Sequence, residues 1–396
     1  MQGFLRADGR KGIRNVVLVA YLVECSHHVA AEIAMPYRQR GVHLIGFPGC
    51  FPNAYADRIM KQLTTHPNVG AVLLVSLGCE SFDRHGLEAA IRASGRPVET
   101  LVIQEAGGTS RTIQAGRAWV ERAIDQLRTT PRVGMGIDEL VVGTICGGSD
   151  ATSGLTANPA AGRAFDLLIQ EGATAIFEET GELIGCEQFM AHRAVTAELG
   201  QEIVASVAKA ARYYAALGHS SFAPGNADGG LTTIEEKSLG AYSKSGKSKI
   251  SGLVKPGDVP PRGGLYLLDV VPDGEVRFGF PNISDNAEIV ELIACGCHLN
   301  LFTTGRGSVV GSAIAPVLKI CANPDTYRRL SEDMDVNAGR ILEGQATLDQ
   351  VGEEIVRQVL AVADGASTAS ERLGHQEFIL TYKWFEPIGP RCLPIG

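Results

Sequence analysis

The residues best suited to chemistry follow a short apolar run, Leu140–Cys146, where the chain changes abruptly into a polar, glycine-rich loop that ends at Pro159. This loop offers a thiol, hydroxyls, a carboxylate, an amide and bare backbone N–H groups in one short segment. In open α/β sheets, ligands bind where strands end and loops begin. We therefore expect a buried strand followed by a functional loop. The alternative is a glycine-rich turn around a buried cysteine.

Three other cysteines each come directly after a short β-branched run: Cys25, Cys50 and Cys79. Parallel strands finish at one edge of their sheet, so these thiols should gather from distant positions. Converging thiolates suit iron, an iron–sulfur cluster or zinc, and three ligands leave an open coordination position for a Lewis-acid catalyst. Cys146 could add a fourth thiol across a domain boundary. The alternative is that these cysteines are packing residues.

Several charged residues and one histidine are candidates for proton transfer or anion binding. Glu236 and Lys237 follow a Gly-Gly-Leu-Thr-Thr loop and should lie in a first helical turn. Arg306 stands in a glycine loop, where a guanidinium can bind a carboxylate bidentately. Lys319 lies in an apolar run, where burial could lower its pKa, and His28 could be a ligand or a proton carrier. For each of them a solvated or salt-bridged position is the alternative.

The elements that must position these residues alternate in type. Four short β-branched runs, at residues 16–23, 42–47, 71–77 and 98–103, are separated by stretches with helical patterns. That alternation is typical of βαβ units and a parallel sheet. We predict an α/β protein with a parallel-sheet, Rossmann- or flavodoxin-like N-terminal domain over residues 1–130 and a larger α/β domain over residues 131–396. Residues 129–136 should form a linker, and residues 187–217 one long helix.

Composition narrows the functional class. The chain has 396 residues, 45% of them apolar and 20% charged, and a formal net charge of −8 without a basic block, so nucleic acid is not an expected partner. No apolar run approaches the length of a membrane span, and the start of the chain does not resemble a signal peptide. We therefore expect a cytoplasmic protein that binds no membrane. Its nine cysteines should be thiols or metal ligands rather than disulfides.

Longer blocks of the sequence resemble the altronate/galactarate dehydratase family, and the similarity covers essentially the whole chain. The blocks are residues 8–15, 66–70, 77–80, 146–150, 156–159, 224–226, 229–240, 302–307 and 333–339. Members of this family dehydrate sugar acids to 2-keto-3-deoxy acids with iron or another divalent metal such as Mn²⁺. A sulfolactate sulfo-lyase branch expels sulfite instead of water.

The resemblance also implies partners. Single-chain members carry a small SAF-type domain before the Asp-Gly-Arg block, which here begins within ten residues of Met1. This implies a separately encoded small SAF-domain subunit, and a homo-oligomer is expected. The four strand-end cysteines match the dehydratases better than the sulfo-lyases, which favours dehydration. A sulfo-lyase or hydrolase acting on a related acid, and a non-catalytic module that binds sugar acids, stay open as alternatives.

Elimination next to a carboxylate needs a metal or cationic clamp, a base for the α-proton and an acid or metal for the leaving hydroxyl. On the resemblance, we assign the metal to Cys25, Cys50 and Cys79, with Cys146 as a fourth ligand or a thiol that faces the substrate. Arg306 would hold the carboxylate. The remaining substrate contacts are assigned to Ser149, Asp150, Asn158, Asn226 and Thr304. Base and acid are left open among Glu236, Lys237, Lys319 and His28.

Overall fold

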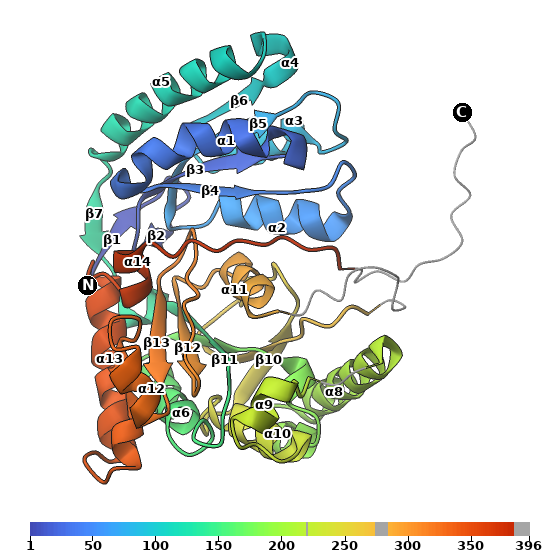
Figure 1. The fold of residues 1–396 in the computed structure, drawn as a ribbon, viewed down its shortest axis with the longest axis vertical. Coiled ribbons are helices and arrows are strands. Elements are labelled where there is room, and N and C mark those ends of the chain that lie inside the picture. Colours follow the sequence, from blue (N-terminus) through green and yellow to red (C-terminus); the bar gives the residue numbers. More distant parts are fainter. Residues whose placement is uncertain (219–220, 274–283, 384–396) are drawn as a thin grey trace.

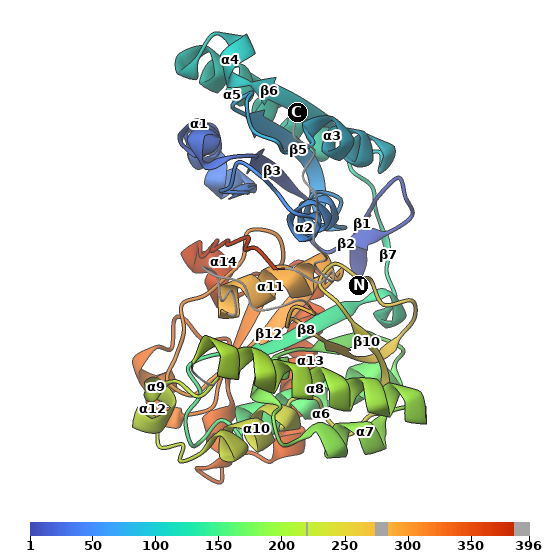
Figure 2. The same ribbon diagram turned by 90° about the vertical axis from the view of Figure 1, so that its right-hand side faces the viewer.

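Two parallel sheets, each flanked by helices, make up the chain in a computed structural model that describes residues 1–218, 221–273 and 284–383. The N-terminal unit lies above the larger C-terminal unit in Figure 1, and Figure 2 shows the same stacking from the side. The predicted α/β class, with a smaller unit followed by a larger one, is confirmed. Among the described helices, none is both long and apolar enough to cross a membrane.

The N-terminal sheet has the strand order β4-β3-β5-β6, and all its pairs are parallel. This is the order of a flavodoxin-like sheet. All eight residues of β5 are buried, because helices cover both faces of the sheet. The strands are β3 (Val16–Tyr21), β4 (Val42–Gly46), β5 (Val69–Ser76) and β6 (Val98–Val102); the helices are α1 (His27–Ala34), α2 (Ala54–Thr64), α3 (Arg84–Ala93), α4 (Ile103–Ala106) and α5 (Thr109–Leu127).

The C-terminal sheet is also parallel throughout, with the order β10-β11-β9-β8-β12-β13-β14. Its strands are β8 (Val141–Cys146), β9 (Thr174–Phe177), β10 (Ile250–Val254), β11 (Gly264–Leu268), β12 (Leu299–Thr304), β13 (Val317–Cys321) and β14 (Val336–Asn337). The helices are α6 (Ala157–Gln170), α7 (Glu187–Arg193), α8 (Ala197–Leu217), α9 (Pro224–Asp228), α10 (Ile234–Ser243), α11 (Asp285–Ala294), α12 (Pro324–Arg329), α13 (Leu348–Ala363) and α14 (Ala369–Leu373).

Two local predictions were wrong. The expected linker contains β7 (Arg132–Gly134), which pairs with β1 (Gln2–Leu5) in a small antiparallel sheet completed by β2 (Lys11–Gly12). The expected long helix is interrupted between α7 and α8, where the Val195 N–H bonds to the Ile250 carbonyl. The Thr196 hydroxyl then caps α8 by accepting from a backbone N–H.

One cluster of buried apolar side chains runs through both units, because α2 of the N-terminal unit packs on α11 of the C-terminal unit. A buried polar network crosses the same interface. The Tyr55 hydroxyl on α2 donates to Glu291 Oε1 of α11 at 2.6 Å, and Lys383 Nζ contacts Oε1 at 2.7 Å and Oε2 at 2.9 Å. The helix α11 is therefore fixed from both the N-terminal unit and the C-terminal segment.

A second link between the units is an ion pair that we expect to govern acid stability. Arg14 binds Glu371 of α14 bidentately, at 2.6 and 2.8 Å. Burial raises the pKa of Glu371, but bonds from Arg14 and Thr368 outweigh it and leave the pKa below its ordinary value. This carboxylate therefore stabilises the fold above its unfolded pKa, and the gain is lost as pH falls through the lower folded pKa.

We predict that Glu371→Gln lowers the free energy of unfolding by about 1–3 kcal/mol near neutral pH and flattens the loss of stability on acidification. Chemical denaturation at several pH values measures both effects. Glu353→Gln is the control, because Glu353 is exposed and only 4.0 Å from its arginine. If the free energy of unfolding fell as steeply with acidification in Glu371→Gln as in the wild type, this prediction would be contradicted.

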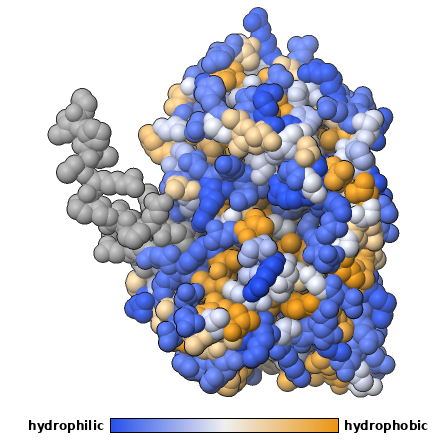
Figure 3. Space-filling model, turned by 180° about the vertical axis from the view of Figure 1, so that it is seen from behind, coloured by the Kyte–Doolittle hydropathy of each residue, from blue (hydrophilic) through white to orange (hydrophobic). Residues whose placement is uncertain are grey.

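Polar residues cover most of the molecular face shown in Figure 3, and apolar residues gather mainly in its lower half.

Candidate functional site

A cavity of about 670 Å³ lies at the carboxyl ends of β8, β9 and β12. In the sheet, β8 lies between β9 and β12, and the strands that follow β8 in the sequence continue on both sides of it. The cavity therefore lies at the topological switch point of the sheet, where ligands of open α/β folds bind. The polar and charged side chains that line it are Cys146, Ser149, Glu179, Glu182, Tyr214, Ser221, Asn226, Lys237, Ser284, Asp285, Glu288 and Arg306.

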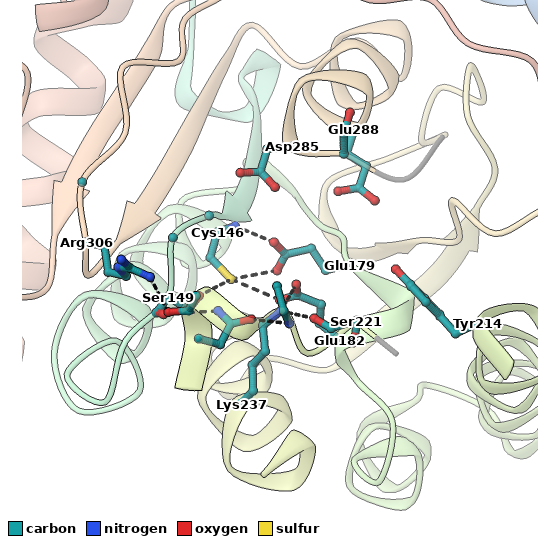
Figure 4. Close-up of a pocket in the computed structure, with 17 residues that line it drawn as sticks. Cys146, Ser149, Glu179, Glu182, Tyr214, Ser221, Lys237, Asp285, Glu288 and Arg306 are labelled. Carbon is teal, nitrogen blue, oxygen red and sulfur yellow. Dashed lines mark hydrogen bonds and ion pairs between the residues drawn. The ribbon is translucent and has the colours of Figure 1, made fainter. Parts of the chain in front are cut away.

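Cys146 is the centre of a buried cluster in this cavity (Figure 4). Its backbone N–H donates to Glu179 Oε1 at 2.8 Å. Its Sγ lies 3.1 Å from Glu179 Oε2 and 3.5 Å from Glu182 Oε2. Within the described ranges, these three residues are the group whose possible metal-ligating atoms all lie within 4.8 Å of one another. One soft and two hard donors therefore converge.

The backbone at Glu179 is strained. Its φ is 82°, and among the described residues no other non-glycine residue has a positive φ. Such a conformation costs about 1–3 kcal/mol and is concentrated at functional sites. In this protein the strain accompanies the placement of the Glu179 carboxylate against Cys146.

Two lysines balance the negative charge of the cluster. Lys244 is fully buried, pairs with Glu179 and lies 3.4 Å from Cys146 Sγ. Lys237 pairs with Glu182 and donates to a backbone carbonyl at 2.7 Å. Burial raises the pKa of Cys146, and Lys244 offsets only part of this. Burial lowers the pKa of Lys237, but Glu182 and Cys146 outweigh it and leave the pKa raised, so Lys237 is a cation and not a base near neutral pH.

Three predicted substrate-binding residues lie on one side of the cavity. The Asn226 amide donates to the Ser149 carbonyl at 3.2 Å, and Ser149 Oγ is 3.6 Å from Cys146 Sγ. Arg306 is exposed at the cavity edge and donates to the Gly225 carbonyl. The structure thus brings together Cys146, Ser149, Asn226, Lys237 and Arg306, five of the residues selected from the sequence.

Four other predicted residues lie beside this cavity. Asp150, Asn158 and Glu236 line a smaller cavity of about 220 Å³ next to it. Asn158 donates to a backbone carbonyl at 3.0 Å and accepts from a threonine hydroxyl at 2.6 Å, and Thr304 accepts from a backbone N–H at 3.0 Å. Asp150 accepts from a threonine and an asparagine side chain. These bonds hold the loops around the site.

Lys319 and His28 line neither cavity. Lys319 is buried on β13, with Nζ 3.4 Å from His375 Nδ1, and burial lowers its pKa. The direction agrees with the expectation from its apolar setting, but the side chain is not part of the cavity. His28 is exposed on α1 of the N-terminal unit.

Cys25, Cys50 and Cys79 follow β3, β4 and β5, three neighbouring strands of the N-terminal sheet, and all three are exposed. Backbone bonds join their loops: Glu24 N–H donates to the Pro48 carbonyl at 3.3 Å, and another links the Cys50 carbonyl to the loop after β5 at 2.9 Å. Over the described ranges, however, they are not among the groups of ligand atoms within 4.8 Å. Cys146 belongs to the cavity of the other unit, so the structure does not place it as their fourth ligand.

Sequence reasoning missed the carboxylates that line the cavity and Lys244, the second lysine that contacts the Cys146 cluster. Glu179 and Glu182 follow β9, so the strand-end argument used for the cysteines would also have selected them. Asp285 and Glu288 begin α11, where acidic residues usually indicate only a helix N-terminus. Lys244 directly follows α10, where a lysine usually indicates only a helix C-terminus.

Comparison with known proteins connects this geometry to a family. Residues 137–386 match the family described as "D-galactarate/Altronate dehydratase, C-terminal", and residues 3–128 match "D-galactarate dehydratase/Altronate hydrolase, second domain". The (2R)-sulfolactate sulfo-lyase subunit beta of Chromohalobacter salexigens is 34% identical over an alignment of 394 positions that covers 96% of each chain. Altronate dehydratase of Bacillus subtilis is 28% identical, covering 96% of this chain and 77% of that protein. Galactarate dehydratase (L-threo-forming) of Escherichia coli is 32% identical, covering 80% and 61%.

Proposed function

Because the chain is an enzyme of the D-galactarate/altronate dehydratase family of lyases, we propose that its cavity dehydrates a sugar acid, an aldonate or aldarate, to a 2-keto-3-deoxy acid with the help of a divalent metal. One observation carries the proposal: a thiol, four carboxyl groups, an ammonium group and a guanidinium line one cavity at the switch point of the sheet, and Lys244 pairs with one of those carboxylates. This set can bind an anionic substrate and stabilise charge during elimination.

The donor set fits a metal. Cys146, Glu179 and Glu182 would hold the ion, and their mixture of sulfur and oxygen suits iron, with Mn²⁺ as a second candidate. A bound metal would supply positive charge to stabilise the negative charge that develops as Cα loses its proton. Within the chain, Lys244 contacts both Cys146 and Glu179 and limits the cost of burying their charges.

The other residues of the cavity would bind and orient the substrate. We propose that Arg306 binds its carboxylate, because the guanidinium lies at the cavity edge and can donate to both carboxylate oxygens at once. Ser149 and Asn226 would hold hydroxyl groups. Asp150, Asn158 and Thr304 would influence substrate binding indirectly, because their hydrogen bonds hold the surrounding loops in place. The positive field of Lys237 would help retain an acid in the cavity.

We also propose a separate iron-binding site in the N-terminal unit, formed by Cys25, Cys50 and Cys79. Their loops are bonded to one another and their thiols are exposed, which supports access by a metal. As three thiolates at one sheet edge they suit iron or an iron–sulfur cluster.

Sulfite elimination from a sulfolactate-like acid is the second candidate function. It is favoured by the match to a sulfo-lyase subunit beta along 96% of both chains. That this relative is named as one subunit of its enzyme also supports our proposal that a separately encoded small SAF-domain subunit completes the enzyme. A homo-oligomer and a cytoplasmic location stay proposals based on the family resemblance and the composition.

The proposed function is tested by supplying the protein, purified without oxygen and with or without a co-expressed small subunit, with aldonates, aldarates and sulfolactate. Fe²⁺ or Mn²⁺ is added, and keto acid and sulfite are measured separately. Keto acid released from sugar acids is the expected result. Release of sulfite only would favour the second candidate. Binding of acids without any product would indicate a sugar-acid-binding module and contradict the enzyme proposed here.

We predict that Arg306→Ala lowers kcat/KM about 10–150-fold, because a hydrogen bond to a charged group contributes about 1.5–3 kcal/mol. The loss should appear mainly in KM, and Arg306→Lys should be intermediate. Steady-state kinetics measure the effect, with Arg357→Ala, on the exposed side of α13, as the matched control. Wild-type kcat/KM in Arg306→Ala would rule out Arg306 as the carboxylate clamp.

A further inference from the structure

The first turn of α11 forms one wall of the cavity. Asp285 and Glu288 both line it and are three residues apart, so they share one face of the helix. Figure 4 shows their carboxyl groups on the α11 side of the cavity, with Lys237 and Arg306 on other sides and Cys146 and Glu179 between. The cavity that Arg306 borders therefore also has two carboxyl groups of α11 on its wall.

The environments of these two carboxyl groups differ. Glu288 is only 3% exposed, and within the described ranges its Oε1 has no hydrogen-bond partner. Burial raises the pKa of Glu288 well above its ordinary value. Asp285 is exposed as a residue, but desolvation of its carboxyl group and the nearby Glu182 raise its pKa to about 6, while Lys237 and Lys244 act to lower it. Burial thus favours the protonated form of Glu288, whereas the two lysines favour the carboxylate form of Asp285. Two carboxyl groups with separated pKa values can act as an acid and a base.

We infer that α11 supplies both proton-transferring groups of the elimination, with the Asp285 carboxylate as the base that takes the proton from Cα and the Glu288 carboxyl as the acid that protonates the departing hydroxyl. This inference rests on the proposed function and replaces the open choice among Glu236, Lys237, Lys319 and His28. Only Lys237 of those four lines the cavity, and there it is a cation.

The step balances without an oxidant or any co-reactant. An oxygen of Asp285 takes the Cα proton, and the electron pair of that C–H bond becomes the new C=C bond. The Cβ–O bond breaks with its pair on oxygen, which takes the Glu288 proton and leaves as water. Asp285 ends protonated and Glu288 ionised, and a proton passed from the first to the second restores the starting state. The enol product tautomerises to the 2-keto acid.

The inferred acid also distinguishes the two candidate reactions. Hydroxide is a poor leaving group and needs a proton as the Cβ–O bond breaks. Sulfite leaves as a stable anion, so its departure needs no acid. An acid at the position of Glu288 on the cavity wall is therefore needed for dehydration and dispensable for sulfite release, so the inference favours a β-hydroxy acid as the substrate.

The protonation of Glu288 depends on the charged groups that face it. Charged side chains shift the pKa values of Glu288, of its buried neighbour Glu178 and of Asp285. These side chains are Glu178, Glu182, Asp285, Glu291, Lys237, Lys244 and Lys383, and Tyr214 of α8 faces the same carboxyl groups. Lysines and carboxylates shift these pKa values in opposite directions, so a variant of any one neighbour would change the pKa of both groups. The test therefore replaces only Asp285 and Glu288.

The experiment compares Glu288→Gln and Asp285→Asn with the control Glu332→Gln, which alters an exposed glutamate outside the cavity. We measure kcat/KM against pH with the sugar acid that the wild type dehydrates, and with an analogue that carries fluoride as its β-leaving group. Both variants should lose about 10²–10⁴-fold on the hydroxy acid. Asp285→Asn should also remove the acid-side limb near pH 6. Glu288→Gln should recover on the fluoride analogue to within about tenfold of the wild type, because fluoride leaves without a proton.

Equal losses of Glu288→Gln on both substrates, or wild-type activity of either variant on the hydroxy acid, would overturn the inference. An acid-side limb retained in Asp285→Asn would overturn the assignment of the base. As a control for folding, calorimetry measures whether each variant still binds the product of the wild-type reaction. A wild type that converts no acid of the panel would instead overturn the proposed function, and the inference with it, so the two failures are distinguishable.

Discussion

Glu179→Gln is expected to remove the bound metal and to lower metal-dependent kcat/KM by more than the roughly 10–100-fold that follows loss of an outer-shell partner. Gln keeps the shape of the side chain but removes one of two carboxylates that converge on Cys146. It also leaves the fully buried ammonium of Lys244 without its partner. Both the ion and the charge balance of the cavity are affected at once.

Metal content after anaerobic reconstitution and steady-state kinetics measure this prediction together. Glu171→Gln is the matched control, because Glu171 is exposed beyond the end of α6. Glu179→Asp keeps the charge and should retain more metal than Glu179→Gln. Full metal content and activity in Glu179→Gln would show that the Cys146 cluster is not the metal site.

The second large effect concerns the interface that holds α11. Lys383→Met should lower the free energy of unfolding by about 3–5 kcal/mol, because it leaves Glu291 buried without its cation. The two side chains are 1% and 0% exposed, so water cannot replace the lost partner. Burial already raises the pKa of Glu291, and removal of Lys383 takes a contact from both carboxylate oxygens, of which Tyr55 donates to Oε1.

Chemical denaturation of the single variants and of Lys383→Met with Glu291→Gln forms a double-mutant cycle. The double variant should be more stable than Lys383→Met, because it no longer buries an unpaired charge. Lys383→Arg is the control that keeps the charge. A loss below about 1 kcal/mol in Lys383→Met, or no recovery in the double variant, would contradict the prediction. Since α11 carries Asp285 and Glu288, Lys383→Met should also impair catalysis.

Regular alternation made much of the fold predictable. The β-branched runs at β3, β4, β5 and β6 are separated by helical patterns, and helices on both faces of a parallel sheet leave its strands apolar throughout. The short strand β7 was missed because three residues carry no periodic signal. The break before α8 was missed because the apolar pattern continues across it, while the backbone bond of Val195 is a tertiary feature.

The candidate site was only half predictable for a similar reason. Cys146, Ser149 and Arg306 lie in glycine-rich loops after strands, and that position alone indicates function. Glu179, Lys244 and Glu288 come from three separate elements and meet only in the folded chain. Acidic and basic residues at helix ends ordinarily cap helices or face water, so their types did not distinguish them.

The central claim is that the metal-dependent chemistry takes place at Cys146, Glu179 and Glu182. The most direct test is anomalous X-ray scattering from crystals grown without oxygen and loaded with Fe²⁺ or Mn²⁺, measured at the absorption edge of the metal used. We predict an anomalous peak among the side chains of these three residues, lost in Glu179→Gln crystals. Peaks confined to the Cys25, Cys50 and Cys79 loops, with none in the cavity, would contradict the account.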